Sequence, residues 1–423
     1  MGKFRVIPSI YLYNGKVVDK DTKEIMGDGD AVELATLYNN KGADELLVFD
    51  YSSTDSEHDA NIGTMIKIQD AVDIQMIVGG NVNRLEDVKK YLYTGAKKAI
   101  LDSTKESNLE MISEAADRFG RDKIAVMIHP DFNFSKIKQI KYDGASLVIA
   151  NDCPEECVGY GIKVMSYNHT FNFDNLVEFG SQDKIYGISD QSFNVDFDFL
   201  NFKSQLKEEG LDTNVFESPM KFSEFKTNAD GMIPVIVQDY KTDKVLMLAY
   251  MNEEAFNLTI KTGKMTYFSR SRNEIWVKGL TSGHYQYVKE LTMDCDLDTM
   301  LAKVYQVGVP CHTGADTCFF NSLIKKEYDE ANPMRVFEDV YNVILDRKKN
   351  PKEGSYTNYL FDKGIDKILK KVGEEATEIV IAAKNPDPQE VKYEISDFLY
   401  HVMVLMAEKG VSWKEITKEL SRR

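Results

Sequence analysis

Short apolar runs recur along the first half of the chain, and they constrain its fold more than any other feature of the sequence. Several of these runs are nearly continuous, as expected for parallel strands that are buried on both faces. The predicted strands cover residues 5–10, 46–50, 75–79, 98–102, 123–128, 145–150, 162–166 and 184–189. Amphipathic stretches lie between them, so the pattern favours a (β/α)8 barrel.

The predicted helices of this barrel are shorter toward its end. Clear helical patterns cover residues 31–41, 85–93 and 109–119, and a glycine suited to a C-terminal cap stands at or just after the end of each. The second half has less room for helices, and the unit ends near residue 216, below the ~250 residues that are typical. We assign residues 1–220 to this domain.

A different pattern begins after Pro219. Short strands separated by turns predict a mostly β, α+β domain at 221–325, followed by a charged linker at 325–333. The predicted strands lie within 231–251, with a turn at 241–243, and at 265–269, 275–278, 285–291 and 301–307. The remainder, 333–423, predicts an all-α bundle. Its helices are expected at 335–349, 364–384, 389–409 and 413–423.

Composition excludes several classes of protein. The net charge of -16 argues against nucleic-acid binding, which needs a basic surface. No apolar stretch reaches membrane-spanning length and no signal peptide is evident, so we expect a cytoplasmic protein without a membrane partner. An odd count of five cysteines favours metal ligands or free thiols over a disulfide framework.

Three of the cysteines, Cys295, Cys311 and Cys318, lie in one segment, 294–320. Thiolates suit zinc, and three protein ligands leave a fourth position for water, whose pKa then falls to about 7. The alternative for any one of them is a buried free thiol. His312 follows Cys311 directly, either as a general acid or base or as a structural imidazole.

Three aspartates, Asp294, Asp296 and Asp298, alternate with the first cysteine. If this segment were a strand, the carboxylates would share one face and Cys295 would point to the other. Carboxylate oxygens suit Mg²⁺, so the pattern predicts two metals separated by the softness of their ligands. The alternative is an acidic turn without a metal.

Residues 228–320 resemble phosphoribosyl-AMP cyclohydrolase along their length. The matching stretches are DGMIPVIVQD, VLMLAYMNEEA, GKMTYFSRSRNEIWVKG, TSGHYQYV, DCDLD and CHTGADTCFF. The resemblance implies Mg²⁺ on the three aspartates and Zn²⁺ on the three cysteines. It also implies a homodimer in which Cys295 comes from the other subunit. The implied reaction is hydrolytic opening of the adenine ring between N1 and C6.

Two arginines and two departures from the family pattern qualify this resemblance. Arg270 and Arg272 either grip a substrate phosphate or form an exposed basic loop. Leu280 stands where the family has Glu, and Leu297 where a small or polar residue is usual. Neither change removes a metal ligand, although Leu280 is expected to weaken substrate contacts.

Paired carboxylates mark the C-terminal domain. Glu375 and Glu378 share one helix face, Glu394 and Asp397 repeat the spacing on the next helix, and Glu374 lies beside the first pair. Antiparallel packing of the two helices would gather these carboxylates, which repel one another unless a cation such as Mg²⁺ binds. Ordinary solvated helix faces are the alternative.

Residues 337–409 resemble phosphoribosyl-ATP pyrophosphohydrolase. The matching stretches are DRKKNPKEGSYT, the EEATE of 374–378 and the EISD of 394–397. The resemblance implies a helical bundle completed by oligomerisation, with Glu375 and Glu378 catalytic. Water would attack between the α- and β-phosphates and release pyrophosphate. Lys348, Lys352 and Lys371 either contact phosphates or form a basic surface, which is the simpler interpretation of each.

Residues 4–119 are similar to the cyclase subunit of imidazole glycerol phosphate synthase. The matching stretches include RVIPSIYLYNGKVV and VGGNVNRLEDVKKYLYTGAKKAILDS. That family uses two aspartates at the ends of the first and fifth strands, where this chain has Tyr11 and His129, and Asn81 replaces a phosphate-loop glycine. We therefore expect a degenerate barrel that acts as a scaffold. The alternatives are retained cyclase or isomerase activity and a module that docks a partner.

One pathway unites the resemblances. They predict a bifunctional, nucleotide- and ATP-binding hydrolase of histidine biosynthesis that acts on small phosphoribosyl nucleotides. The C-terminal domain makes phosphoribosyl-AMP, and the central domain then opens its ring. Cys153 and Cys157 are left outside this scheme: their i, i+4 spacing permits a metal on a helix, but free thiols are the simpler interpretation.

Overall fold

Two compact units make up the chain, Met1–Ser322 and Leu323–Arg423. The computed structural model describes residues 3–327, 332 and 335–421. Parts of the predicted linker (328–331 and 333) and of the last predicted helix (422–423) lie outside the described residues. In the described part of the chain, no helix is both long enough and apolar enough to cross a membrane.

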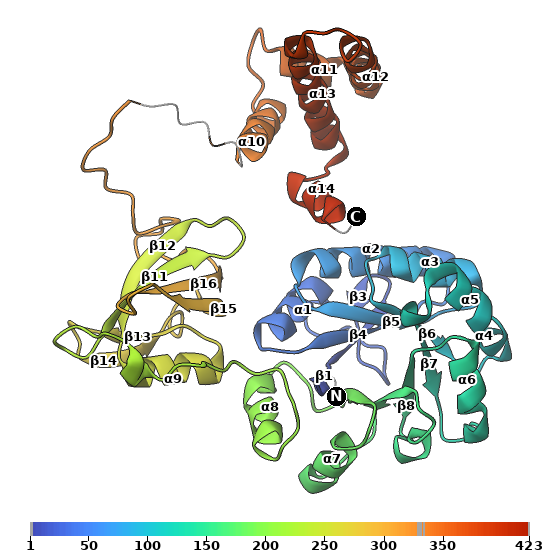
Figure 1. Ribbon diagram of the computed structural model, residues 1–423. Coiled ribbons are helices and arrows are strands. Elements are labelled where there is room, and N and C mark those ends of the chain that lie inside the picture. The colour runs from blue at the N-terminus through green and yellow to red at the C-terminus, as the bar shows by residue number, and fades with distance from the viewer. Residues whose placement is uncertain (1–2, 328–331, 333–334, 422–423) are drawn as a thin grey trace. The chain divides into compact units, whose positions relative to one another are not determined.

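The first unit begins with a ten-stranded sheet of order β1-β10-β9-β8-β7-β6-β5-β4-β2-β3 (Figure 1). Neighbouring strands are parallel except for β2 and β3. Because β1 pairs with β10 while the adjoining β2 pairs with β4, the first strand closes the sheet into a barrel, and the Ser9 and Ser189 hydroxyls meet at 2.8 Å across this closure. The strands are β1 Arg5–Val6, β2 Ser9–Tyr13, β3 Lys16–Val17, β4 Glu45–Asp50, β5 Gln75–Gly80, β6 Lys98–Asp102, β7 Ile124–Ile128, β8 Leu147–Asn151, β9 Lys163–Tyr167 and β10 Ile185–Ser189. The predicted barrel is thereby confirmed.

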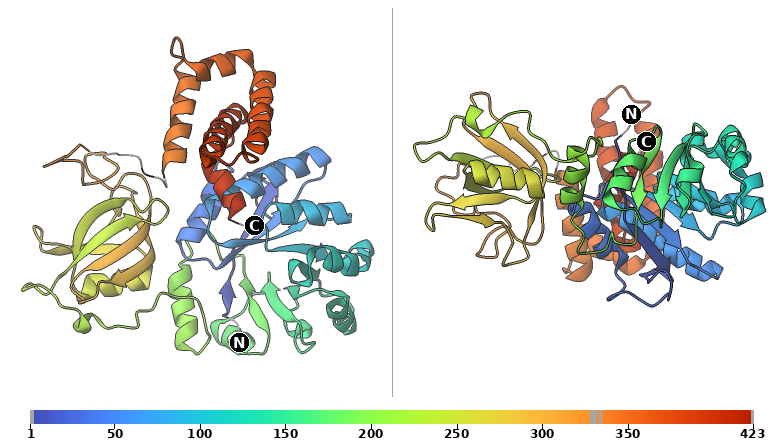
Figure 2. Two further views of the ribbon diagram at one scale, coloured as in Figure 1. Left: turned by 45° about the horizontal axis from the view of Figure 1, so that its top comes forward. Right: turned by 90° about the horizontal axis from the view of Figure 1, so that it is seen from below.

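Helices cover the outside of these strands (Figures 1 and 2). They are α1 Ala31–Asn40, α2 Asp55–Ala71, α3 Leu85–Tyr93, α4 Glu106–Glu110, α5 Ile112–Phe119, α6 Ile137–Asp143, α7 Phe173–Gly180 and α8 Phe199–Glu208. The helix predicted at 109–119 is confirmed as α5 over 112–119, whereas residues 109–110 end the separate short helix α4. The Asn108 amide of α4 donates to the Asp102 carbonyl at the end of β6 (3.2 Å). Between β8 and β9 the chain forms one 3-10 turn, Glu155–Cys157, in agreement with the short connections expected there.

Side chains fill the barrel, which therefore has a packed centre. A second, larger cluster lies between the strands and the surrounding helices. The inner cluster contains Ile7, Leu47, Phe49, Ile77, Ile100, Ala125, Met127, Leu147, Ile149, Met165, Tyr167 and Tyr186. The alternation of inward and outward apolar residues explains why the strand sequences read as continuous apolar runs.

The remainder of the first unit is the predicted α+β domain. A four-stranded sheet of order β12-β11-β16-β15 packs with a two-stranded β13-β14 ribbon and one helix around a single apolar core. The elements are β11 Ile233–Asp239, β12 Val245–Met251, α9 Glu253–Thr262, β13 Thr266–Ser269, β14 Glu274–Val277, β15 Gln286–Met293 and β16 Met300–Gln306. Every strand falls within three residues of its predicted position, whereas α9, capped by the Asn252 side chain, was not predicted.

Within this unit, Asp73 of the barrel accepts hydrogen bonds from three side chains of the α+β domain. The donors are the ammonium groups of Lys289 (2.8 Å) and Lys241 (3.3 Å) and the hydroxyl of Tyr240 (3.1 Å). Lys289 belongs to β15, whose far end begins the aspartate segment. Opposing charges hold the pKa of Asp73 below its ordinary value, even though burial acts in the other direction.

The second unit is helical, as predicted. Its helices are α10 Val336–Lys349, α11 Tyr356–Lys363, α12 Ile365–Ala382, α13 Pro388–Lys409 and α14 Trp413–Leu420. The apolar core includes Tyr341, Ile344, Leu360 and Met403. Helices α12 and α13 pack side by side, joined by a short loop that contains Pro386 (Figure 1). The short helix α11, which the Ser355 side chain caps, was not predicted.

Candidate functional site

The three aspartates lie in the turn between β15 and β16. The prediction that a strand places them on one face is wrong, because β15 ends at Met293 and β16 begins at Met300. The turn gathers them by another route: one carboxylate oxygen of each of Asp294, Asp296 and Asp298 lies within 4.8 Å of the other two. Three exposed, hard oxygen donors at this spacing fit Mg²⁺.

Asp294 also builds the turn that carries it. Its carboxylate accepts the backbone N–H groups of Asp298 (3.0 Å) and Thr299 (3.1 Å). Desolvation acts to raise the pKa of Asp294, but these N–H donors hold it below its ordinary value. Leu297 has φ 64°, a left-handed conformation that costs a residue other than glycine about 1–2 kcal/mol. This strain explains why a small or polar residue suits the position better.

Two of the cysteines lie together at the edge of the same sheet. The backbone N–H of Cys318 donates to the Leu246 carbonyl of β12 (2.8 Å). Cys311 is buried, and its sulfur lies 3.1 Å from the Thr313 hydroxyl. Hydrogen bonds from Thr313 lower the pKa of Cys311, whereas burial and contact with Cys311 raise that of Cys318. Two adjacent sulfurs provide half of a tetrahedral zinc donor set.

Cys295 lies apart from this pair. It is exposed in the β15–β16 turn, and among the residues that the structure describes no trio of possible metal ligands within 4.8 Å includes it. Among the described residues, the clustered thiols of one chain are therefore those of Cys311 and Cys318. His312 is exposed next to Cys311.

Lys278 is a residue that sequence reasoning missed. It follows β14 and is 8% exposed. Burial lowers its pKa, and the nearby thiols of Cys318 and Cys311 act in the opposite direction. A buried ammonium beside two thiols favours their negatively charged, thiolate form. The signal in the sequence was weak, since it is one lysine at the end of an amphipathic strand.

The two arginines differ in their surroundings. Arg272 pairs with Glu274 at 3.0 Å, so its charge is already balanced. Arg270 stacks over the Tyr250 ring, 3.9 Å from its centroid, and lines a cavity of about 580 Å³ together with Trp276. Of the two, Arg270 is the better placed to receive a phosphate.

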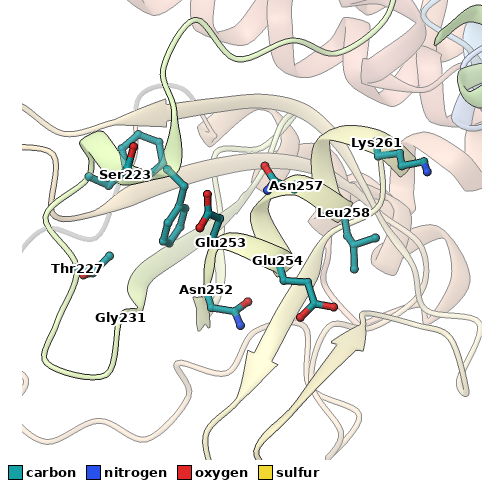
Figure 3. Close-up of a pocket in the computed structure, with 11 residues that line it drawn as sticks. Ser223, Thr227, Gly231, Asn252, Glu253, Glu254, Asn257, Leu258 and Lys261 are labelled. Carbon is teal, nitrogen blue, oxygen red and sulfur yellow. The ribbon is translucent and has the colours of Figure 1, made fainter. Parts of the chain in front are cut away.

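Another cavity of the α+β domain contains none of the predicted residues. It measures about 770 Å³ and lies at the start of α9, where Figure 3 shows Asn252, Glu253, Glu254 and Asn257 around it. Acidic side chains at a helix N-terminus are the ordinary complement of the helix dipole. The cavity therefore carries no chemistry that the predicted sites require.

Three of the five predicted carboxylates of the second unit converge. One oxygen each from Glu375 of α12 and from Glu394 and Asp397 of α13 lies within 4.8 Å of the others. Glu375 is 4% exposed, and a buried carboxylate needs a cation or hydrogen bonds. Of the three carboxylates, Glu375 is buried, Glu394 is partly buried and Asp397 is exposed. Such oxygen donors fit Mg²⁺, which usually keeps water or phosphate oxygens as its further ligands.

The other two carboxylates have different neighbours. Glu378 is exposed and contacts Glu375, which raises the pKa of Glu378. Glu374 bonds to two lysines, Lys370 at 3.3 Å and Lys371 at 3.1 Å, and has no place in the converging trio. Lys371 also reaches Glu375 at 2.8 Å, so it lies inside the cluster rather than on an open basic surface.

A histidine and a tyrosine support this cluster, and sequence reasoning missed both. His401 is 4% exposed, with Nδ1 2.8 Å from the Asp397 carbonyl and Nε2 3.0 Å from the Tyr356 hydroxyl. The backbone carbonyl can only accept, so Nδ1 of His401 donates to it, and Nε2 shares the second hydrogen bond with the Tyr356 hydroxyl. The imidazole thus fixes the backbone that carries Asp397 and links α13 to α11.

Aromatic side chains occupy the C-terminal mouth of the barrel, where barrel enzymes hold their substrates. Tyr11 stacks on Phe49 with ring centroids 5.5 Å apart, contacts Tyr51 at 5.4 Å, and shares a hydroxyl hydrogen bond with Tyr167 (3.0 Å). Burial raises the pKa of Tyr11. The position that carries a catalytic aspartate in the similar cyclase is therefore part of a packed aromatic group.

His129, at the second such position, belongs to a polar network. Its Nε2 lies 3.1 Å from Asp102, and its Nδ1 lies 3.0 Å from the Asn151 amide. The bond to Asp102 raises the pKa of His129. Asn81, which stands where the resembled family has a glycine, donates to the Ser52 hydroxyl (3.0 Å). Cys153 and Cys157 are both buried near this mouth, as free thiols.

Family models match three segments of the chain. A model described as phosphoribosyl-AMP cyclohydrolase matches residues 247–320, and one described as phosphoribosyl-ATP pyrophosphohydrolase matches 337–423. A third, described as histidine biosynthesis protein, matches 5–162. The aspartate turn and the cysteine pair fall in the first segment, and the converging carboxylates fall in the second.

Three curated relatives each match slightly less than half of this chain. A histidine biosynthesis bifunctional protein HisIE from Thermoanaerobacter pseudethanolicus is 51% identical over 209 residues, which is 46% of this chain and 97% of that protein. The protein of the same name from Caldanaerobacter subterraneus is 54% identical over 200 residues, 47% of this chain and 96% of its own length. The Bacillus subtilis protein is 44% identical over 200 residues, with 47% and 95% covered.

Proposed function

The chain belongs to the family of histidine biosynthesis bifunctional proteins, HisIE, and we propose how its residues divide the two hydrolytic reactions of that family. It is a hydrolase with a cyclohydrolase domain and a pyrophosphohydrolase domain. The observation that carries the proposal is the occurrence of one compact acidic cluster in each domain, together with a thiol pair in the first.

In the C-terminal unit, we assign the first step, which converts phosphoribosyl-ATP to phosphoribosyl-AMP and pyrophosphate. Glu375, Glu394 and Asp397 would hold Mg²⁺, which would bridge to the substrate phosphates and neutralise their developing charge. Glu378 adjoins this trio and is open to solvent, so it is placed to orient or deprotonate the attacking water. His401 keeps Asp397 in position.

In the α+β domain, we assign opening of the adenine ring of phosphoribosyl-AMP. Cys311, Cys318 and the partner subunit's Cys295 would hold Zn²⁺, which supplies an activated water for attack on the ring carbon. The aspartate turn would hold Mg²⁺, and Arg270 would receive the phosphate. His312 stands next to the thiols, where it can pass a proton to the ring nitrogen that leaves.

For the barrel, we propose a scaffold without cyclase activity. Tyr11 packs with aromatic neighbours at the barrel mouth, and Tyr11 and His129 stand where the similar cyclase has its acid and base. The bonds of Asp73 to β15 and to Tyr240 give the barrel a structural role, because they brace the strand that leads into the aspartate turn.

The test is to supply the purified chain with phosphoribosyl-ATP, Mg²⁺ and Zn²⁺ and to follow pyrophosphate, phosphoribosyl-AMP and the ring-opened product. Cys311→Ser should stop ring opening alone, so that phosphoribosyl-AMP accumulates. Glu378→Gln should slow pyrophosphate release, whereas ring opening should proceed at the wild-type rate when phosphoribosyl-AMP is supplied directly. Wild-type behaviour of both variants would show that these residues do not carry the two reactions.

Removal of residues 1–220 tests the role of the barrel. The relatives are covered almost completely by the remaining half of this chain, so that half should fold by itself. Both activities should persist in the shortened chain, with a less stable α+β domain. Conversion of the cyclase substrate by the full chain, lost on deletion, would instead favour a barrel with its own activity.

A further inference from the structure

Lys371 occupies an unusual position for a lysine on a largely exposed helix. Its ammonium group lies 2.8 Å from Oε1 of Glu375 and 3.1 Å from Oε2 of Glu374, and its side chain is 23% exposed. Glu375 is the buried member of the carboxylate trio. The ammonium group therefore touches the ligand that a bound metal would need most.

The charges around this point explain why a cation is there. Glu375, Glu394 and Asp397 converge within 4.8 Å, and Glu378 and Glu374 adjoin them. His401 lies 3.7 Å from Glu375, but its Nδ1 donates to the Asp397 carbonyl at 2.8 Å and so makes no hydrogen bond to this carboxylate. Among the described residues, Lys371 is the one whose ammonium bonds to the trio.

Lys371 and a metal ion cannot both remain at this carboxylate without strong repulsion. Mg²⁺ bonds to oxygen at about 2.0–2.1 Å, so an ion on either oxygen of Glu375 would lie within about 7 Å of the ammonium group. We propose that Lys371 is an internal counter-ion that holds the metal site together when it is empty and is displaced from Glu375 when the metal binds. This inference rests on the metal site of the proposed function.

After displacement from Glu375, Lys371 would still be held close to the carboxylate cluster by Glu374. Glu374, already bonded to Lys371, lies outside the trio, so the flexible side chain can release Glu375 and keep Glu374. The ammonium group would then remain near the carboxylate cluster, where it could contact a phosphate that binds there. Exchange of the two cations thus couples metal binding to the binding of the polyphosphate.

The experiment titrates Mn²⁺ into the full chain, with zinc retained and Mg²⁺ removed, and follows free Mn²⁺ by electron paramagnetic resonance. Glu394→Gln identifies the C-terminal site as the class of Mn²⁺ ions that it abolishes. Lys371→Met should tighten that class at least tenfold, the factor expected for removing a positive charge about 6 Å from a divalent ion even in water. The same variant should raise the KM for phosphoribosyl-ATP several-fold.

Lys370→Met is the matched control. Lys370 is adjacent on α12, bonds to Glu374 alone at 3.3 Å and is 65% exposed, so its loss changes the net charge equally without freeing Glu375. It should tighten Mn²⁺ binding less than about threefold. Lys371→Arg, which keeps the charge and the length, should give no gain and covers the case in which the methionine variant does not fold.

The outcomes distinguish a failure of the proposed cation exchange from a failure of the proposed metal site. Unchanged or weaker Mn²⁺ binding in Lys371→Met, an equal gain in Lys370→Met, or a gain in Lys371→Arg would overturn the exchange. A lysine that only stabilises the helix cannot tighten metal binding and weaken substrate binding at once when it is removed. If Glu394→Gln abolishes no class of Mn²⁺ ions, the proposed metal site itself is wrong.

Discussion

The separation of Cys295 from Cys311 and Cys318 makes a quantitative prediction about subunits. If two chains exchange Cys295 across a two-fold axis, each zinc site contains Cys295 of one chain and Cys311 and Cys318 of the other. Cys295→Ser and Cys311→Ser should then each abolish ring opening as homodimers. In a heterodimer of the two variants, one site carries both substitutions and the other carries neither.

The expected magnitude follows from counting sites. Random reassociation of equal amounts gives half heterodimers, each with one intact site of two, so about a quarter of the wild-type ring-opening rate should return. The assay unfolds and refolds the mixed variants, then measures ring opening and bound zinc, with each variant refolded alone as a control. Pyrophosphate release, which neither substitution touches, should remain unchanged throughout. If the refolded mixture were no more active in ring opening than the separately refolded variants, a site shared between chains would be refuted.

Other predictions concern the barrel mouth and the aspartate turn. Tyr11→Asp should destabilise the barrel by about 3–5 kcal/mol, because it removes two aromatic contacts and the hydroxyl partner of Tyr167. Tyr11→Phe should cost only about 1 kcal/mol. Hydrogen exchange in β2 measures both effects, and equal effects would contradict the aromatic packing described for the barrel mouth. The NMR titration of His129 should have its midpoint above the ordinary value of about 6.5 and fall toward it in Asp102→Asn. Since the folded-state pKa is raised, this ion pair should stabilise the barrel below the unfolded pKa of histidine and cease to do so as pH rises through the folded-state value. Asp296→Asn should raise the Mg²⁺ concentration needed for ring opening and leave the zinc content unchanged; a loss of zinc would show that the two ligand sets are not separate.

Sequence patterns predicted the sheet architecture well because burial on both faces leaves a direct trace in the residues. The strands β6 and β10 were placed within a residue of their bounds, since each is an apolar run ended by polar residues. The short helices α9 and α11 were missed because two to three turns between stronger patterns give little periodicity. Their capping residues, Asn252 and Ser355, were the available signals.

The candidate sites were predicted in composition more than in geometry. The spacing of Asp294, Asp296 and Asp298 is the same in a strand and in a turn, and only the pairing of β15 with β16 distinguishes the two. The role of His401 depends on Tyr356, which lies 45 positions away on another helix. Such contacts arise from tertiary packing between distant residues, so no local pattern in a single sequence indicates them.

The closure of the barrel through its first strand has a consequence for biosynthesis. The strand β1 pairs with β10, and Ser9, just after β1, meets Ser189 across 180 positions, so this edge has no partner until the last strand has left the ribosome. At 5–20 residues per second the nascent chain waits on the order of ten to forty seconds with the inner faces of its first strands uncovered. The N-terminal half is thus the part of the chain that most needs protection from aggregation in the cell. The two hydrolase domains emerge after it and close their own cores over much shorter separations.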